Sequence, residues 1–530
     1  MSLFLIGVTM FEYTKKMFSL MNIPPHAIET LKDEKLDYKL DALFYDAIKH
    51  INHAIKNNQK IFVGGDFDAD GICATTIMVK YLKKKNADVG YYISDRIVEG
   101  YGVPIERIQA AIDKNYDLFI FVDNGVSLHD QLELLDKNNK VSLIFDHHTI
   151  EQQPKCTLLL HPDTLSEYYD RLCGAGLSYL LAKADMLDDS EMLQLAMVAT
   201  IGDMMPLVRF NRSLVRHGLR SINESPMVHL SNLVKKQNID EEDVAFLIVP
   251  KLNAVGRLSD QANVNSLVSF FLNEDVGQVV SFVHAIEELN NNRKKIAKDM
   301  EKIALDYVSD ESFNFIVDES FHEGVVGILA GSIMRLTNKP TMVATIKQDV
   351  IKGSLRSDTV DLFEVISHAS AYVTRFGGHS KAAGIEVKAT QFESFKQEIL
   401  QRLENVEVSS TTQPVAVIDE KLISLEAIKE FESYRPFGME FERPIVALTN
   451  VSVIRSYHND KVNLRKWMVS VNNTIIEAVL FSDAFDEFKE ASALTLIGSI
   501  AYKPYNSSDK IVCKVHKVLP AHCAQDEILI

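Results

Sequence analysis

The sequence predicts an α/β protein whose N-terminal half forms a doubly wound parallel sheet. Between about residues 60 and 160, short runs rich in Val, Ile and Phe alternate with segments that have helical spacing. The runs KIFVGGD, DLFIFVDNG and VSLIFDHH lack polar alternation, which is typical of strands buried on both faces by helices. In such a sheet the carboxyl ends of the strands form one edge, where ligands bind.

The predicted elements follow one another in a regular order. Strands are expected at 60–66, 87–94, 117–125 and 141–148, and helices at 71–85, 103–114, 128–137, 175–187 and 191–203. The charged stretch 282–308 predicts a long helix that tethers one domain to the next, or equally a solvated helix with paired charges. After Glu311 a second, smaller α/β domain begins. Beyond the polar linker VEVSSTTQP, short strands broken by turn residues predict a small β-barrel.

Composition excludes several classes of protein. The 530 residues are enough for three to four domains, and 46% hydrophobic with 24% charged residues is typical of a globular protein. The five cysteines are scattered without zinc-site spacing, which favours free thiols in a reducing compartment. The apolar start MSLFLIGVTM has no preceding basic segment and is expected to be a strand or packing arm. No run approaches the length that spans a bilayer, so we expect a cytoplasmic protein without a membrane partner.

The net charge of −17, from 56 basic and 73 acidic residues, argues against a protein that coats duplex DNA. A global sum leaves room for a local basic groove. It also leaves room for a site that gathers aspartates around bound cations.

Acidic and imidazole side chains follow the ends of three of the four predicted N-terminal strands and of one helical run. These residues are Asp66, Asp68 and Asp70, then Asp123, then Asp146, His147 and His148, and finally Asp203. Because parallel strands end at one edge, we expect these groups to converge there. Several like charges cannot share such a place without a compensating cation.

Hard oxygen ligands with one or two imidazoles suit Mn²⁺ or Mg²⁺ better than zinc or copper. Two such ions bridged by a carboxylate are a known device for phosphoryl chemistry. Taken singly, each motif has a simpler interpretation: GGDFDADG and VDNG could be turns, and paired histidines are usually incidental. Their joint occurrence at strand ends favours the metal site.

The sequence resembles the DHH phosphoesterase superfamily and, within it, the RecJ family of single-stranded-DNA-specific exonucleases. The resemblance rests on GGDFDADGICAT, ISDRIVEGYG, FVDNG, FDHH, ATIGDMMPL, PKLNAVGRL, HEGVVGILAGSI, KGSLRS and FGGHSKAAG, and covers about residues 60 to 390. It implies an N-terminal extension (1–55), a DHH catalytic domain (56–225), a helical connector (226–310), a DHHA1 substrate-binding domain (311–405) and an oligonucleotide-binding (OB)-like barrel (406–530).

The resemblance also implies roles for individual residues. The implied metal ligands for two Mn²⁺ or Mg²⁺ ions are Asp66, Asp68, Asp123 as the bridge, His147 and Asp203. The implied catalytic and supporting residues are His148, Asp70, Asp146 and, from the second domain, His379. The implied substrate-binding residues are Arg96, Asn253, Arg257, Ser354, Arg356, Gly377 and Gly378, of which Arg96, Ser354 and Arg356 would hold a 5′-terminal phosphate or adjacent backbone. Arginine suits a phosphate because its fork donates bidentately.

Two regions depart from the family's pattern or carry weaker expectations. The segment that introduces the barrel usually contains Gly-Asn-Pro, but residues 439–444 read MEFERP here, which puts the barrel's grip on DNA in doubt. Tyr457, Trp467 and Tyr502 are candidates for stacking on bases, or equally for packing in the barrel core.

The implied activity is a processive exonuclease that degrades single-stranded DNA from 5′ to 3′ and releases 5′-mononucleotides in DNA repair and recombination. Single-stranded DNA is the expected partner, with a single-strand-binding protein and a helicase as further candidates. Two alternatives stay open. One is a nanoRNA or cyclic-dinucleotide phosphodiesterase of the same superfamily, and the other is a catalytically inactive replication scaffold.

Overall fold

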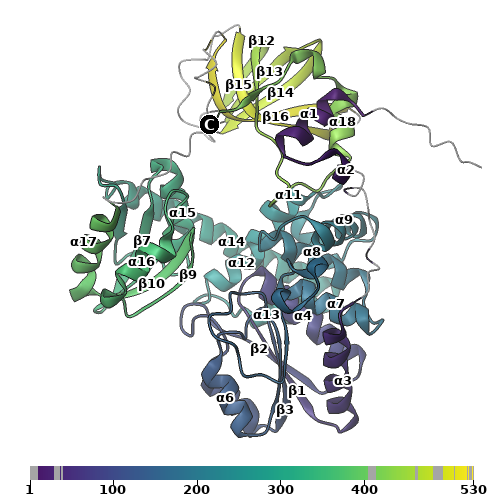
Figure 1. The fold of residues 1–530 in the computed structure, drawn as a ribbon, viewed down its shortest axis with the longest axis vertical. Coiled ribbons are helices and arrows are strands. Elements are labelled where there is room, and N and C mark those ends of the chain that lie inside the picture. Colours follow the sequence, from purple (N-terminus) through teal and green to yellow (C-terminus); the bar gives the residue numbers. More distant parts are fainter. Residues whose placement is uncertain are drawn as a thin grey trace, which may run out of the picture. The chain divides into compact units, whose positions relative to one another are not determined.

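The computed structural model describes residues 10–28, 31, 36, 40–403, 414–459, 464–481, 493–505, 508–521, 523 and 528. The chain divides into two compact units, Leu36–Ser409 and a unit that joins Met1–Lys35 to Ser410–Ile530. Each unit is described by itself below (Figure 1). No helix among the described ranges combines the length and the apolar character needed to cross a bilayer.

The first sheet of the larger unit is parallel, as the apolar runs predict. Its strands are β1 (Lys60–Gly65), β2 (Val89–Ile93), β3 (Tyr116–Val122), β4 (Val141–Phe145) and β5 (Leu158–Leu160), in the order β2-β1-β3-β4-β5. The three-residue strand β5 was not expected from the sequence. The order reverses between β1 and β3, which makes their carboxyl ends the topological switch point where ligands of such sheets bind.

Helices cover both faces of this sheet. They are α3 (Ala42–Lys56), α4 (Ala69–Lys84), α5 (Ile105–Asp113), α6 (His129–Lys137), α7 (Gly174–Ala184) and α8 (Ser190–Gly202). Helices α3, α4, α7 and α8 pack together on one face. Helices α5 and α6 cover the other face with Phe62, Phe119 and Phe121 of the strands in a shared core. In Figure 1, α3 and α6 lie on opposite sides of β1 and β3. Burial on both faces explains why the strands are apolar throughout.

A helical segment follows the first sheet. It comprises α9 (Arg209–Glu224), α10 (Val228–Val234), α11 (Glu241–Asp243), a π-helical turn (Val244–Ile248), α12 (Val249–Arg257), α13 (Asn265–Phe271) and α14 (Val276–Leu305). The wide π turn lies just before Pro250 of α12, which has no N–H to donate to the preceding turn. Helix α14 begins six residues before the expected 282 because the Asp275 side chain caps it through Gln278 N.

The second α/β domain has a mixed sheet in the order β6-β7-β8-β10-β9. Its elements are β6 (Asn314–Val317), α15 (Val326–Thr337), β7 (Thr341–Lys347), β8 (Val350–Arg356), α16 (Leu362–His368), β9 (Arg375–His379), β10 (Ala382–Lys388) and α17 (Phe392–Leu403). Only β6 and β7 pair in parallel, and the other pairs are antiparallel. A hydrophobic cluster of Leu258, Met300 and residues of α15 joins this domain to α12 and α14.

The smaller unit contains the expected barrel. Its strands are β11 (Ala416–Val417), β12 (Val446–Asn459), β13 (Leu464–Val471), β14 (Thr474–Phe481), β15 (Ala493–Tyr505) and β16 (Ser508–Pro520), and pairing of β12 with β15 closes the sheet. Asn472 and Asn473 both have positive φ, of 45° and 61°, as a two-residue hairpin turn requires. Trp467 is 3% exposed and therefore packs in the barrel core, which is the second of the two alternatives that the sequence left open for it.

An N-terminal helix, α1 (Glu12–Leu20), completes this smaller unit by packing on α18 (Leu425–Glu432). Phe18 is buried, with its ring centroid 5.7 Å from that of Phe431 and 4.8 Å from that of Tyr434. The expected extension 1–55 is thus shared between the two units, because α3 belongs to the larger one. The opening residues 1–9, expected to be a strand or packing arm, lie outside the described residues.

Replacing Phe18 by Ala is expected to destabilise the barrel unit by about 3–5 kcal/mol, because a buried aromatic side chain is lost and a cavity remains. Calorimetry of thermal unfolding would measure the change. Phe11→Ala is the matched control, since the Phe11 side chain is 43% exposed. An equal effect of the two substitutions would contradict the packing of α1 on α18.

Candidate metal centre

The acidic residues predicted from the sequence meet at the carboxyl ends of β1 and β3. Three groups of side chains each offer ligand atoms that lie within 4.8 Å of one another. The groups are Asp66, Asp68 and Asp123; Asp70, His147 and Asp203; and Asp123, His147 and His148. Asp123 and His147 each belong to two groups, so the three sets form one continuous cluster. All five predicted metal ligands are therefore brought together.

Backbone geometry aims the carboxylates of the first loop. The Asp68 carboxylate caps α4 by accepting hydrogen bonds from Asp70 N (3.0 Å) and Gly71 N (3.1 Å). The Asp70 carboxylate accepts from Gly174 N (2.7 Å) and from Ala175 N (2.8 Å), at the start of α7. Asp70 therefore ties the β1 loop to a helix about a hundred residues away, which fits its expected supporting role in the site.

Asp123 occupies a crowded place after β3. Its φ is +59°, a left-handed conformation that Asp tolerates better than most residues, and its N–H donates to Phe145 O (2.9 Å). A Cβ on Gly174 would lie 2.6 Å from Asp123 Cβ. Glycine at position 174 thus lets the start of α7 approach both Asp70 and Asp123.

The histidines of the DHH triplet differ in their partners. His147 Nε2 lies 3.1 Å from Asp123 Oδ1 and 3.4 Å from Asp203 Oδ2, inside the carboxylate cluster. His148 Nδ1 instead lies 2.7 Å from Asp146 Oδ1. Because this contact is made to a carboxylate, it favours the tautomer with a proton on Nδ1.

Asp146 is fully buried and organises the triplet through the backbone. Its carboxylate accepts hydrogen bonds from Val126 N (3.0 Å), His147 N (2.8 Å) and His148 N (3.2 Å). Burial alone would raise the pKa of Asp146, but the contacts with His148 and Val126 hold this pKa at about 2. Asp146 is thus a permanent anion that positions both histidines.

The carboxylates of the cluster disfavour one another's ionisation. Burial raises the pKa of Asp66 and that of Asp123 well above the ordinary value, and neighbouring aspartates raise both further. Burial, with Asp70 and Asp68, raises the pKa of Asp203 to about 8. Asp66 Oδ1 is buried without a hydrogen-bond partner among the described residues. Buried polar atoms normally have partners, so this oxygen and the crowded carboxylates fit divalent cations.

Tyr101 is a site residue to which the sequence reasoning assigned no role, although the motif EGYG contains it. It is half-buried, and its hydroxyl lies 3.1 Å from His148 Nδ1 and 3.4 Å from Asp123 O. The sequence does not indicate that a single loop tyrosine belongs to the site, because only the fold brings Tyr101 close to the DHH triplet.

The predicted substrate-binding residues lie in several places. The Arg96 guanidinium stacks over the Phe67 ring, 4.8 Å from its centroid, directly beside the β1 loop. Asn253 Oδ1 accepts from Ala69 N (2.8 Å) and so supports that same loop. Its predicted contact with substrate stays a prediction.

The second domain carries the remaining predicted residues. Ser354 Oγ accepts from Arg356 Nη1 (2.8 Å) on β8. Gly377, Gly378 and His379 lie on β9 and are exposed. Among the described residues, no group of side chains able to share one ion includes His379. The predicted role of His379 near the metals is therefore untested.

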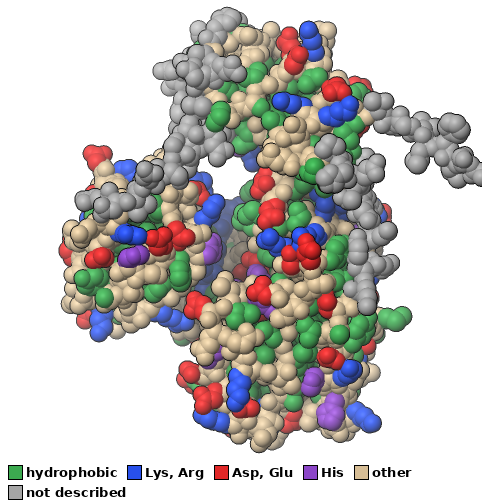
Figure 2. Space-filling view, viewed as in Figure 1, with side chains coloured by type: hydrophobic (Ala, Val, Ile, Leu, Met, Phe, Trp, Pro, Cys, Tyr) green, Lys and Arg blue, Asp and Glu red, His purple; other side chains and the backbone are tan. Residues whose placement is uncertain are grey.

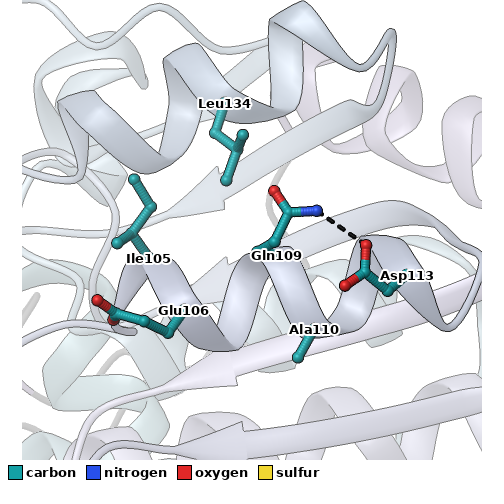
Figure 3. A pocket seen from close by; sticks show the side chains of 6 residues that line it. All are labelled: Ile105, Glu106, Gln109, Ala110, Asp113 and Leu134. Atoms are coloured by element: carbon teal, nitrogen blue, oxygen red, sulfur yellow. Dashed lines mark hydrogen bonds between the residues drawn. The ribbon is translucent and has the colours of Figure 1, made fainter.

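A pocket of about 390 Å³ between α5 and α6 lies outside this cluster. Its lining residues include Ile105, Gln109, Asp113 and Leu134, and Gln109 Nε2 donates to Asp113 Oδ1 (2.9 Å; Figure 3). None of the cluster's residues lines it, and its walls are mostly apolar. It has no feature of a phosphoryl-transfer site.

Comparison with known proteins identifies three domains in the order that the fold displays. Residues 60–201 match the N-terminal domain of the DHH family, residues 302–405 the DHHA1 domain, and residues 416–517 the RecJ OB domain. The single-stranded-DNA-specific exonuclease RecJ of Bacillus subtilis (strain 168) is 29% identical over 505 residues, 89% of this chain and 64% of that protein. The protein of the same name from Thermus thermophilus is 32% identical over 363 residues, 67% of this chain and 53% of that protein.

Solved structures agree with this assignment. A crystal structure of RecJ from Thermus thermophilus in complex with Mn²⁺ has a TM-score of 0.83 at 23% identity, covering 97% of this chain and 76% of that chain. A structure of exonuclease RecJ bound to manganese has a TM-score of 0.62 at 30% identity, covering 70% of this chain and 96% of that chain. This chain spans only about half to two thirds of the length of the curated relatives named above. With three matching domains and a 30% identical relative covered almost completely, the chain belongs to the RecJ family of the DHH phosphoesterases.

Proposed function

We propose that this protein is a metal-dependent exonuclease that hydrolyses single-stranded DNA from its 5′ end and releases 5′-mononucleotides. The observation that carries the proposal is the convergence of Asp66, Asp68, Asp123, His147 and Asp203 into one cluster with too much buried negative charge to exist alone. Relatives named as single-stranded-DNA-specific exonucleases support the choice of substrate.

We propose that these five residues hold two Mn²⁺ or Mg²⁺ ions, with Asp123 between them. Carboxylate oxygens and one imidazole are a donor set that suits both metals. When bound, such ions supply a nucleophilic hydroxide near neutral pH and stabilise the charge that develops on the phosphate. The protein's own contribution is to fix the ligand positions through the hydrogen bonds that hold Asp68, Asp70 and Asp146.

We propose that His148 contacts the substrate phosphate directly. Its Nδ1 is engaged by Asp146, which leaves Nε2 to donate a hydrogen bond to an oxygen of the scissile phosphate. Although burial opposes it, the contact with Asp146 raises the pKa of His148 to about 9, which favours the protonated, donating form. Tyr101 would help to orient this ring through its hydroxyl.

The substrate strand would enter beside the β1 loop, with its 5′ phosphate near Arg96, Ser354 and Arg356. Arg96 is held flat by Phe67, so its guanidinium edge is oriented in advance. In the barrel, Tyr457 is 54% exposed and available for stacking on a base, whereas the Tyr502 hydroxyl donates a hydrogen bond to Asp509.

A single-strand-binding protein and a helicase would supply such strands. The free state of all five cysteines supports a reducing, cytoplasmic setting.

A nuclease assay tests the proposal directly. End-labelled single strands, duplexes and a dinucleotide are incubated with Mn²⁺, with Mg²⁺ or with chelator. We expect a 5′ label to leave at once as a mononucleotide from the single strand, with no reaction in chelator. Preference for the dinucleotide would instead indicate the small-substrate phosphodiesterase. Inactivity toward every substrate with either metal would indicate a scaffold.

Replacing Asp123 by Asn should abolish turnover and lower Mn²⁺ affinity on the order of a hundredfold or more, because the shared carboxylate loses its charge. Asn keeps the shape and tolerates the positive φ. In chelator the unfolding temperature should stay the same or rise, because one of several repelling buried charges is removed. The exposed Asp130→Asn serves as control. Normal Mn²⁺ affinity in Asp123→Asn would refute the assignment of Asp123 as a metal ligand.

Metal binding should release protons and strengthen as the pH rises. Because burial and its acidic neighbours raise the pKa of Asp203 to about 8, this carboxyl is protonated in the metal-free protein below that pH and must ionise to bind. Apparent Mn²⁺ affinity should therefore increase by about tenfold per pH unit for each proton displaced, and level off above pH 8. Titration calorimetry in buffers of different ionisation enthalpy counts the protons. An affinity independent of pH from 6 to 8 would show that Asp203 does not lose a proton when the metal binds.

A further inference from the structure

The β2 loop, residues 94–102, carries two side chains that lie beside the acidic cluster. The Arg96 guanidinium lies 4.8 Å from the centroid of the Phe67 ring, and the Tyr101 hydroxyl lies 3.1 Å from His148 Nδ1. Figure 2 shows acidic and basic side chains intermixed on the face that it draws, rather than a broad field of one sign. Individual charges such as that of Arg96 therefore have to be placed accurately by the loops that carry them.

The backbone of the β2 loop has two positions of high conformational freedom. Gly100 and Gly102 flank Tyr101 with φ of 78° and 83°, in the left-handed region that favours glycine. Glycine loses more conformational entropy than other residues when it is fixed, so holding this loop in one arrangement opposes a large entropy. Contacts from other parts of the chain decide how often the loop adopts that arrangement.

Asp95 is the residue through which the β2 loop is tied to another part of the chain. Its Oδ1 accepts hydrogen bonds from Ile97 N (2.9 Å) and Val98 N (2.9 Å) of its own loop. The same oxygen accepts from Ser259 Oγ at 2.7 Å, although Ser259 lies 164 residues further along the chain. Burial opposes it, but these three hydrogen bonds lower the pKa of Asp95, so at neutral pH the carboxylate is an anion and a strong acceptor.

The segment that carries Ser259 also holds the end of β2. Asn265, at the start of α13, accepts from Ile93 N at 2.8 Å and donates through Nδ2 to Ile93 O at 2.8 Å. Strand β2 is the outer strand of its sheet, and outer strands have backbone groups that face no neighbouring strand. The Asn265 side chain pairs with those groups at Ile93. The chain is therefore held up to the first residue of the β2 loop, and Ser259 provides the next contact.

The main chain at Ser259 is itself anchored on both sides. Leu258 is fully buried in the hydrophobic cluster with α14 and α15. On the other side, His322 Nδ1 accepts from Gly324 N (3.1 Å), which places the ring proton on Nε2, and this nitrogen lies 3.1 Å from Asp260 Oδ1. The Ser259 hydroxyl is therefore a donor at a fixed position.

The same segment reaches the β1 loop. A Cβ on Gly256 would lie 2.3 Å from Phe67 O, so glycine at position 256 lets α12 approach the backbone of the β1 loop closely. Phe67 is the residue on whose ring Arg96 stacks. The segment from Gly256 to Asn265 thus contacts both loops that border the acidic cluster, and it fixes how these loops lie relative to each other.

We propose that Ser259 is a positioning residue for substrate binding that acts through Asp95. Its hydrogen bond holds the β2 loop so that Arg96 lies over the β1 loop and Tyr101 reaches His148. This inference rests on the proposed function, and it assigns a part in substrate binding to a residue outside the acidic cluster. When only a fraction of the molecules has the binding-competent loop, the apparent affinity falls by that fraction. In the bound complex the loop is in place, so turnover at saturation does not depend on the hydroxyl.

The test compares substitutions that differ in the hydroxyl group. Ser259→Ala removes it and Ser259→Thr keeps it. Ser269→Ala is the matched control, because the Ser269 hydroxyl lies 2.7 Å from that of Tyr91 and so joins α13 to β2 without a contact to the β2 loop.

Three measurements are made on each protein. Fluorescence anisotropy in Ca²⁺ gives the affinity for a 5′-phosphorylated single strand with a 3′ fluorophore, and gel analysis confirms that the strand stays intact. Hydrolysis of the same strand in Mn²⁺ gives KM and kcat. Amide hydrogen exchange, followed by mass spectrometry, reports on the peptide that contains residues 94–102.

We expect Ser259→Ala to weaken binding and raise KM by about tenfold, which is the size of effect that a hydrogen bond to a charged group has. The value of kcat should stay the same, and the amides of the β2 loop should exchange faster. Ser259→Thr and Ser269→Ala should behave like the wild type in all three measurements.

Unchanged affinity together with unchanged exchange of the β2 loop in Ser259→Ala would overturn the inference. So would a loss of affinity in a folded Ser259→Thr as large as that in Ser259→Ala. A lower kcat and a lower unfolding temperature at constant KM would also overturn it, because a smaller folded fraction only reduces the number of active molecules. A wild-type protein whose affinity for single strands depends on Ser259 but which hydrolyses none would refute the proposed function and leave this inference standing.

Discussion

Repulsion among buried carboxylates is the constraint on which the larger unit depends. Asp66, Asp123 and Asp203 are held close together at the switch point of the parallel sheet, although each is harder to ionise there than in water. Backbone amides fix the supporting aspartates, as Gly174 and Ala175 do for Asp70. The fold therefore holds these carboxylates in an arrangement whose repulsion destabilises the protein and is relieved by bound cations. Functional sites commonly differ from the rest of a structure in this way.

Among the described residues, no arginine forms an ion pair with the aspartates of the cluster, although the charge of Arg96 lowers the pKa of Asp66. If Arg96 or Arg257 paired directly with the aspartates, the carboxylates would be neutralised and the site would lose its affinity for cations. Arg96 instead stacks on Phe67, and Arg257 is held by a backbone carbonyl. Carboxylates that keep their charge suit divalent cations, and such cations can stabilise the charge of a phosphodiester.

The helical connector is more than a tether. Helix α14 shares a hydrophobic cluster with α12 and α15, and its Asn290 is 4% exposed. In the smaller unit, α1 has a comparable role, since Phe18 packs among Phe431 and Tyr434 beside the barrel. In both cases a segment that looks like an extension or a linker in the sequence is part of a packed core.

The sequence by itself determined most of the elements of the first sheet and the convergence of its acidic and imidazole groups. Strand and helix periods are local properties, so the runs that end at Asp66, Asp123 and His147 predicted the parallel sheet and the acidic edge of the metal centre. Contacts across long separations were decided only by the tertiary structure, because chain closure brings together residues that share no pattern. Tyr101 beside His148 and Trp467 inside the barrel are such cases. The role of each of these side chains depends on its neighbours, and neither spacing nor composition predicts those neighbours.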